Sequence, residues 1–165
     1  MLDEKGFTLI EVIVSLVLIG IMAAIAGMGL VRIVEGYVFA KQNAETTQKA
    51  QIAIARIAKE LGAATGITTA VPASITYTRT GSGTIIISFA NSDITVSANA
   101  GTATLINNVT AFTQSYFNAA GVQFYPVTAT ELANIRRIDF NLTVSGANNT
   151  PLSFNNNSVF IQESF

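Results

Sequence analysis

Between Phe7 and Val31 the chain reads FTLIEVIVSLVLIGIMAAIAGMGLV, a run of 25 residues in which Glu11 is the sole ionisable side chain. As an α-helix this run would be about 37 Å long, enough to cross a hydrocarbon core of about 30 Å. Arg32 follows it directly. The sequence therefore predicts a single membrane-spanning helix near the N-terminus.

A secretory signal peptide is an alternative interpretation of the same segment. Ala24-Ile25-Ala26 precedes Gly27 and fits the small-residue pattern of a signal cleavage site. However, residues 1–5 hold two acids against one lysine, and Glu11 would interrupt the apolar part of the signal. These charges favour the membrane helix.

Overall composition narrows the class of protein. The chain has 165 residues, nine basic against ten acidic side chains, and neither cysteine nor histidine. Near-neutral charge argues against the basic surface that phosphate neutralisation requires, so we expect no nucleic-acid partner. Without cysteine or histidine the chain lacks disulfides, thiolate chemistry, the commonest general base and the commonest metal ligands. We therefore expect no metal and no other cofactor.

The carboxylates of the C-terminal part are too scattered to suggest catalysis. They are Asp93, Glu131, Asp139 and Glu163. Isolated carboxylates in turns and on strand faces are usually solvated, so the chain is not expected to be an enzyme. Arg136 and Arg137 would point to opposite faces of a strand, and pairing of Arg137 with Asp139 on one face is the simplest use of these charges.

Residues 32–62 continue the helix but become amphipathic. Apolar residues recur at steps of three and four residues, which places them on one face: Ala50, Ile54, Ile57, Ala58 and Leu61. Lys41, Glu45 and Lys49 follow at i, i+4 and i+8 on a solvated face. Gly62 is a plausible end, so one helix from Phe7 to Gly62 is predicted.

Residues 63–165 break into short alternating runs separated by turn residues, which is typical of antiparallel strands. The clearest is 138–144, where Ile138, Phe140, Leu142 and Val144 alternate with polar residues. Thr128 and Glu131 have capping-box spacing and predict one helical turn. The other predicted strands are 75–79, 84–89, 94–97, 104–106, 109–117, 122–125, 152–154 and 159–161. The predicted fold class is α+β, with the amphipathic helix packed on an antiparallel sheet.

Glu11 is the residue of the apolar run with the strongest functional signal. A Glu at bilayer depth costs about 2.5–3.5 kcal/mol, so it is a functional hypothesis by default. Cleavage after Gly6 would give Phe7 a free α-amine, and in a packed assembly that amine could pair with Glu11 of a neighbouring copy. Alternatively, Glu11 reaches the membrane interface, since it lies four residues from the end of the run. Physics alone leaves these two possibilities open.

Lys5-Gly6-Phe7-Thr8-Leu9-Ile10-Glu11 and the apolar helix behind it resemble the class III signal of type IV pilins and type II secretion pseudopilins. The resemblance implies cleavage between Gly6 and Phe7 by a prepilin peptidase, N-methylation of Phe7, and a role for Glu11 in subunit docking. It also implies the lollipop plan of that family, with a long helix joined to a β-rich head.

Further segments resemble minor pilins and J-type minor pseudopilins, a subclass thought to sit near the filament tip. They are Ala53–Leu61, Leu105–Phe112 leading to Tyr116-Phe117-Asn118, and Ile135–Asp139. The chain departs from many family members in its acidic leader, Asp3-Glu4, and in having no cysteine for a C-terminal disulfide loop. The calcium-stabilised loop of some major pseudopilins lacks support too, because Asp139 and Glu163 are the only acids after Glu131.

The combined prediction is a minor pilin or pseudopilin with four segments: a leader (1–6), a transmembrane and assembly half-helix (7–31), an amphipathic half-helix (32–62) and a β-rich head (63–165). The resemblance implies other pilin subunits, prepilin peptidase and an inner-membrane assembly platform as partners, with membrane lipid around the helix before assembly. It places the precursor in the inner membrane and the product in a periplasmic or surface filament. The alternative is a secreted or membrane-anchored β-rich binding module that never polymerises.

Overall fold

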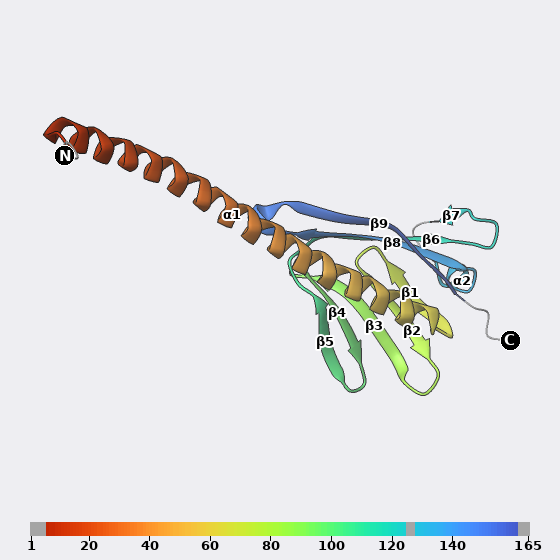
Figure 1. Ribbon diagram of the computed structural model, residues 1–165. Helices are drawn as coiled ribbons and strands as arrows, with labels where there is room; N and C mark the ends of the chain where they lie inside the picture. The colour runs from red at the N-terminus through yellow and green to blue at the C-terminus, as the bar shows by residue number, and fades with distance from the viewer. Residues whose placement is uncertain (1–5, 125–127, 162–165) are drawn as a thin grey trace. The chain divides into compact units, whose positions relative to one another are not determined.

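The structure is a computed structural model that describes residues 6–124 and 128–161. It divides into two compact units, residues 1–41 and 42–165. The long helix α1, Leu9–Gly62, contributes residues to both (Figure 1). The predicted single helix is confirmed, although it begins at Leu9 rather than at Phe7.

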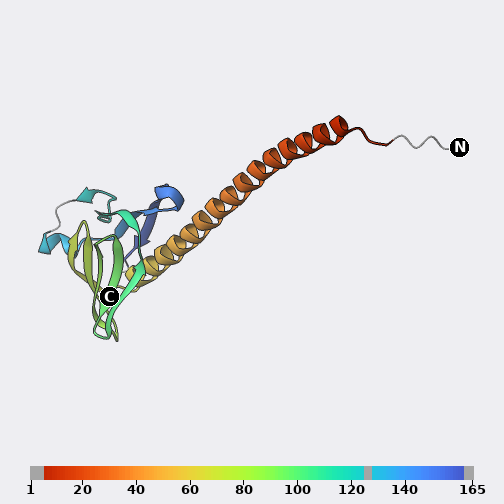
Figure 2. The same ribbon diagram turned by 90° about the vertical axis from the view of Figure 1, so that its left-hand side faces the viewer.

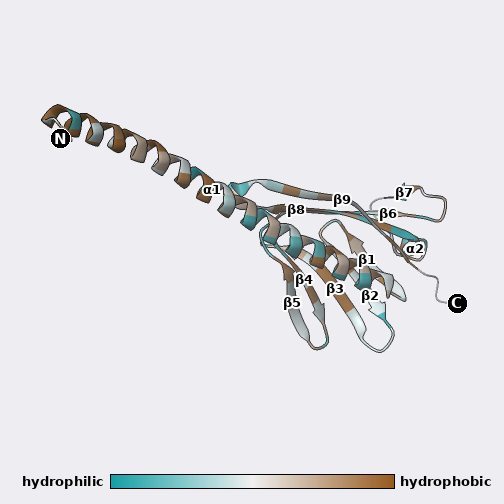
Figure 3. Ribbon diagram, viewed as in Figure 1, coloured by the Kyte–Doolittle hydropathy of each residue, from teal (hydrophilic) through white to brown (hydrophobic). Residues whose placement is uncertain are grey.

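In the first unit, α1 presents its apolar side chains to the outside. Leu16, Met22 and Leu30 are 63%, 70% and 64% exposed. Hydrophobic residues predominate along the early turns of α1, and hydrophilic residues become frequent further along (Figure 3). Within the described residues α1 is the one helix long and apolar enough to cross a membrane.

In the second unit, the C-terminal part of α1 buries one face. Ala50, Ala53, Ile57 and Leu61 are at most 1% exposed, while Ile54 and Ala58 are partly buried beside them. The predicted apolar face is therefore confirmed. Ala53, which was not predicted to belong to it, is among its most buried residues. These side chains belong to the same hydrophobic core as the strands described next.

A five-stranded antiparallel sheet follows α1 as a meander in the order β1-β2-β3-β4-β5. Its strands are β1 (Gly66–Val71), β2 (Ser74–Arg79), β3 (Gly83–Ala90), β4 (Asp93–Ala98) and β5 (Gly101–Ile106). The β3–β4 turn is formed by Asn91 and Ser92, both with positive φ, at 51° and 65°. Such tight turns keep consecutive strands adjacent, and the β2–β3 and β4–β5 turns lie at the same end of the sheet (Figures 1 and 2).

A second sheet of four strands has the order β7-β6-β8-β9. Its strands are β6 (Val109–Phe117), β7 (Gln123–Phe124), β8 (Arg137–Ser145) and β9 (Pro151–Phe160). The short helix α2, Ala129–Leu132, lies between β7 and β8 in the chain, and the 3₁₀ turn η1, Ala147–Asn149, joins β8 to β9. In β8 the predicted alternation is confirmed, because Ile138, Phe140, Leu142 and Val144 are all 0% exposed.

Aromatic rings connect the two sheets. The Phe112 ring of β6 lies 6.4 Å from the Phe89 ring of β3 and 6.3 Å from the Phe140 ring of β8, measured between centroids. Edge and tilted contacts of this kind stabilise aromatic pairs beyond their buried area. Both sheets thereby share one core with the C-terminal part of α1.

The predicted α+β fold, with the helix packed on antiparallel strands, is confirmed. The strands form two sheets rather than one, because β6 does not continue the meander. Asn108 has a φ of 58°, and after it β6 pairs with β8 and β7 instead of β5. Strand β1 was not predicted, since its GITTAV sequence lacks clear alternation. The two predicted strands at 152–154 and 159–161 fall on one strand, β9. The pairing of β9 with β8 contains a register shift between Phe140 and Leu142 of β8.

Two further predictions concern the segment around α2, namely one helical turn and the strand 122–125. The capping box of α2 is present, with Thr128 and Glu131 bonded to each other. The predicted strand 122–125 is represented by β7, Gln123–Phe124, and Tyr125 lies outside the described residues.

Candidate assembly site

The predicted cleavage site lies just before the start of α1. Gly6, Phe7 and Thr8 are not helical, and a side chain at Gly6 would meet nothing within 4 Å. Phe7 is 82% exposed. The Gly6–Phe7 peptide bond is therefore accessible and free of helical structure, while the rest of the predicted leader, residues 1–5, lies outside the described residues.

Thr8 caps the helix that follows. Its hydroxyl oxygen accepts a hydrogen bond from the Glu11 backbone N–H at 3.3 Å, and its carbonyl accepts from the N–H groups of Glu11 and Val12 at 3.1 and 3.3 Å. A Thr in this position satisfies one of the unpaired donors at a helix N-terminus. This role was not predicted, although Thr8-x-x-Glu11 has the spacing of a capping signal.

Glu11 consequently sits in the first turn of α1, where the helix dipole favours a negative charge. It is exposed, and within residues 6–124 and 128–161 no ion pair of Glu11 is recorded. The Ser15 hydroxyl donates to the backbone carbonyl of Glu11 at 2.7 Å. This bond does not involve the Glu11 side-chain carboxylate. The arrangement presents one carboxylate at a fixed position on an otherwise apolar helical surface.

Large hydrophobic side chains surround this carboxylate along the helix. Ile10, Val12, Val14 and Ile19 are 65%, 47%, 49% and 63% exposed. An apolar surface of this extent needs a cover of lipid or of other apolar helices. The segment is thus suited both to a bilayer and to a helical assembly.

The head contains a second charged centre, which was not predicted from the sequence. Glu60 is 4% exposed and pairs with Arg79 at 2.6 Å and with Arg56 at 2.9 Å. The Tyr77 hydroxyl donates to Glu60 Oε2 at 3.3 Å, and burial, with the adjacent Glu60 charge, raises the pKa of Tyr77. This buried carboxylate, with its three partners, anchors the end of α1 to β2. The sequence signal for it was a Glu on the apolar face of the helix.

The remaining carboxylates do not form a site together. Asp139 pairs with Arg137 at 3.0 Å, as predicted, and the Arg137 guanidinium also lies 4.0 Å from the centre of the Phe117 ring. Hydrogen bonds from Thr128 lower the pKa of Glu131. Glu163 lies outside the described residues, among which no cluster of three potential metal-binding side chains occurs.

Comparison with protein families gives a match that coincides with the segment described above. The family description "prokaryotic N-terminal methylation motif" matches residues 1–27. No curated protein matches the chain. The match spans the predicted cleavage site, the Thr8 cap, Glu11 and most of the exposed apolar run.

Proposed function

We propose that the chain is a minor subunit of a type IV pilus or a type II secretion-like filament, because residues 1–27 match the prokaryotic N-terminal methylation motif, which indicates a class III prepilin signal. Subunits of this family are structural proteins rather than enzymes. The observation that carries the proposal is the lone carboxylate of Glu11 on an exposed apolar helix that begins directly after the Gly6–Phe7 bond.

Processing is the first step of the proposed mechanism. Prepilin peptidase cuts between Gly6 and Phe7, and Phe7 is then N-methylated. The exposed, non-helical backbone at this bond supports the assignment, because a peptidase must accommodate its substrate in an extended conformation. Cleavage creates a cation at Phe7, close to an acid that has no recorded ion pair within the described residues.

Assembly is the second step. The new α-amine of Phe7 in one subunit pairs with Glu11 of a neighbour, while the exposed apolar side chains of both helices pack against one another. In a low-dielectric environment, leaving a charge unpaired costs more free energy than forming the ion pair gains. The pair therefore mainly disfavours assemblies in which the two helices have the wrong axial register. Apolar packing provides the attraction between subunits, and the charge pair selects one stagger.

The proposed cellular route follows from the same helix. The precursor is held in the inner membrane as a single-pass protein, with lipid covering the segment from Phe7 to Val31. An inner-membrane assembly platform then transfers processed subunits into a periplasmic or surface filament with other pilins or pseudopilins. Assignment to the minor class rests on the segments that resemble minor pilins and J-type pseudopilins.

The mature N-terminus provides the first test. N-terminal sequencing and intact mass of the protein recovered from its native membrane should show a chain that starts at methylated Phe7. A chain that starts at Gly27 would instead indicate an ordinary signal peptide and a secreted module. An intact Met1 would contradict processing altogether.

Substitution of Glu11 tests the assembly step. Glu11→Gln removes the charge at nearly constant size, and we expect it to reduce incorporation into filaments at least tenfold while the precursor remains cleavable. Glu35→Gln is the matched control, because Glu35 is exposed on the same helix beyond the apolar run. Filament incorporation can be quantified by mass spectrometry of sheared filaments, and equal incorporation of both variants would refute the charge-pair mechanism.

A further inference from the structure

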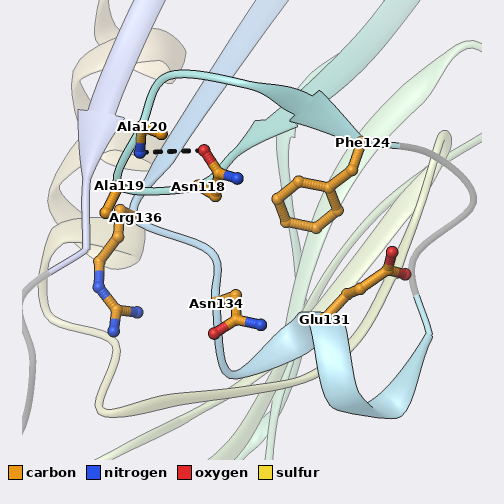
Figure 4. A pocket seen from close by; sticks show the side chains of 7 residues that line it. All are labelled: Asn118, Ala119, Ala120, Phe124, Glu131, Asn134 and Arg136. Carbon is orange, nitrogen blue, oxygen red and sulfur yellow. Dashed lines mark hydrogen bonds between the residues drawn. The ribbon is translucent and has the colours of Figure 1, made fainter.

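A cleft in the head is lined by residues that have no role in the function proposed above. It has a volume of about 490 Å³ and is lined by Asn118, Phe124, Glu131, Asn134 and Arg136, with two alanines of the β6–β7 turn. This volume falls within the range of about 300–1,000 Å³ that small-molecule sites occupy. Figure 4 shows the Phe124 ring projecting from β7 between Asn118 and Glu131.

Local hydrogen bonds hold both walls of the cleft in place. On one wall, Asn118 Oδ1 accepts from the backbone N–H groups of Ala120 and Val122 at 3.0 and 2.9 Å. On the other, Glu131 Oε2 accepts from the backbone N–H and the hydroxyl of Thr128 at 2.7 and 2.8 Å. These bonds fix the side chains before any ligand arrives, which lowers the entropic cost of binding.

The two walls are also joined to each other. The Arg136 backbone N–H donates to the Phe117 carbonyl at 2.8 Å, directly before Asn118. The Arg136 guanidinium donates to the carbonyls of Ala133 and Ile135 at 2.9 and 3.1 Å. The cleft is therefore a preformed feature of the head.

The polar side chains that line the cleft retain donors and acceptors outside these hydrogen bonds. Within the described residues no partner is recorded for Asn118 Nδ2, Asn134 Oδ1 or Glu131 Oε1. These atoms supply one amide donor and two acceptors around a single aromatic ring. A ligand that fills the cleft must offer both hydrogen-bond donors and acceptors, and one apolar face.

The charges of the cleft narrow the class of ligand. Glu131 and Arg136 contribute one charge of each sign, so neither an anion nor a cation finds a site of uniform opposite charge. A metal ion is not supported, because the described residues that line the cleft include one carboxylate and the described part of the chain contains no cluster of metal-binding side chains. A neutral, polyhydroxylated ring meets all these conditions, since its hydroxyl groups both donate and accept, and its C–H face suits an aromatic ring.

We propose that this cleft binds a neutral sugar residue, with Phe124 stacking on the ring and Asn118, Glu131 and Asn134 binding its hydroxyl groups. The compact arrangement of three polar side chains around one ring fits a cyclic ligand better than an extended peptide. The site requires neither processing nor assembly of the chain. It gives the head a ligand-binding role in addition to its place in a filament.

The test uses the full chain in a detergent without a sugar head group, because maltoside or glucoside detergents would compete. The probes are methyl glycosides of glucose, galactose, mannose and N-acetylglucosamine, each followed by saturation-transfer NMR. N-acetylglycinamide serves as a peptide probe. We expect saturation transfer to the ring C–H protons of at least one glycoside and none to the peptide probe.

Substitutions assign the binding to the cleft. Phe124→Leu keeps an apolar side chain but removes the ring, and we expect it to weaken glycoside binding about tenfold. Phe160→Leu is the matched control, because Phe160 is 69% exposed and does not line the cleft. Asn134→Ala, at an exposed position, should weaken binding about threefold. This second variant decides the test if circular dichroism shows that Phe124→Leu disturbs the fold.

Three results would overturn the proposal. The first is that no glycoside binds the full chain. The second is that glycoside binding is unchanged in Phe124→Leu and Asn134→Ala. The third is that only N-acetylglycinamide binds, which would assign the cleft to peptides.

Discussion

The Thr8 hydroxyl accepts a hydrogen bond from the Glu11 backbone N–H across 3.3 Å, so the residue that caps α1 also stabilises the turn that carries the carboxylate proposed to act in assembly. Loss of an N-cap side chain costs about 1 kcal/mol. The first helical turn has no packing within the described residues to compensate, because its side chains are exposed. The backbone conformation at Glu11 thus depends on the Thr8 hydroxyl group.

We expect Thr8→Ala to increase fraying of the first turn of α1, whereas Thr8→Ser should preserve the cap. The measurement is hydrogen exchange of the Glu11 and Val12 amides in detergent micelles, expected to accelerate about fivefold in Thr8→Ala. Thr46→Ala is the control, because the Thr46 hydroxyl bonds to the Gln42 carbonyl in the middle of the helix. Equal exchange rates in Thr8→Ala and the parent chain would mean that the cap does not stabilise this turn.

Glu60→Ala should destabilise the head by about 3 kcal/mol, because it leaves a partly buried arginine and a buried tyrosine hydroxyl without their partner. Arg56→Ala should cost at most about 1 kcal/mol, since the Arg56 side chain is 57% exposed. Urea unfolding followed by near-ultraviolet circular dichroism of the tyrosines gives both values. Lys59→Ala, next to Glu60 in the chain, is the control, and a similar loss in all three variants would argue against a special role of Glu60.

Tyr77 predicts a specific loss of stability at alkaline pH. Its pKa in the folded head is raised above the ordinary value of 10.0 by burial and by Glu60, so the folded state binds the phenolic proton more tightly than the unfolded state. This contribution is complete below pH 10 and is lost as the pH rises above it. Tyr77→Phe should therefore show a shallower decline of the urea midpoint above pH 10 than the parent chain. Tyr37→Phe, at a side chain 69% exposed, should decline like the parent, and identical profiles for all three would contradict the assignment.

Gly146→Ala should destabilise the head by about 1–3 kcal/mol. A Cβ atom at Gly146 would collide with Asn43 Oδ1 and approach the Thr150 carbonyl to 3.2 Å. Asn43 Oδ1 also accepts the Ala147 backbone N–H at 2.8 Å, so the substitution would displace a bond between the helix and the β8–β9 connection. Thermal unfolding by circular dichroism measures the effect. Gly36→Ala, with nothing within 4 Å, should not lower the midpoint, and a neutral Gly146→Ala would show that the connection yields without cost.

Features set by local sequence could be predicted, and those set by long-range pairing could not. The alternation from Ile138 to Val144 identifies β8 because its period is that of a strand with one buried face. The division into two sheets depends on Asn108, where a left-handed backbone conformation turns the chain away from β5. The pattern of apolar residues does not indicate that a strand pairs with a different neighbour.

The candidate site shows the same contrast. Gly6, Phe7 and Glu11 could be selected from sequence, because a single acid in an apolar run is costly and a short motif precedes it. The Glu60 centre was missed, since its partners Tyr77 and Arg79 lie 17 and 19 residues away in the chain and only the fold brings them together. The proposed sugar cleft was missed for a similar reason, because one wall comes from β6–β7 and the other from α2 and the connection that follows it.

The start of α1 at Leu9 has a consequence for the proposed cleavage after Gly6. All helical hydrogen bonds recorded at this end lie on the C-terminal side of the Gly6–Phe7 bond, beginning with those to Thr8. A cut at that bond would therefore break none of them, and the precursor and the mature subunit would share the same helix. In the proposed mechanism, removal of the leader changes the charge at the end of the chain without refolding α1, so that a stored precursor becomes competent for assembly by covalent chemistry alone.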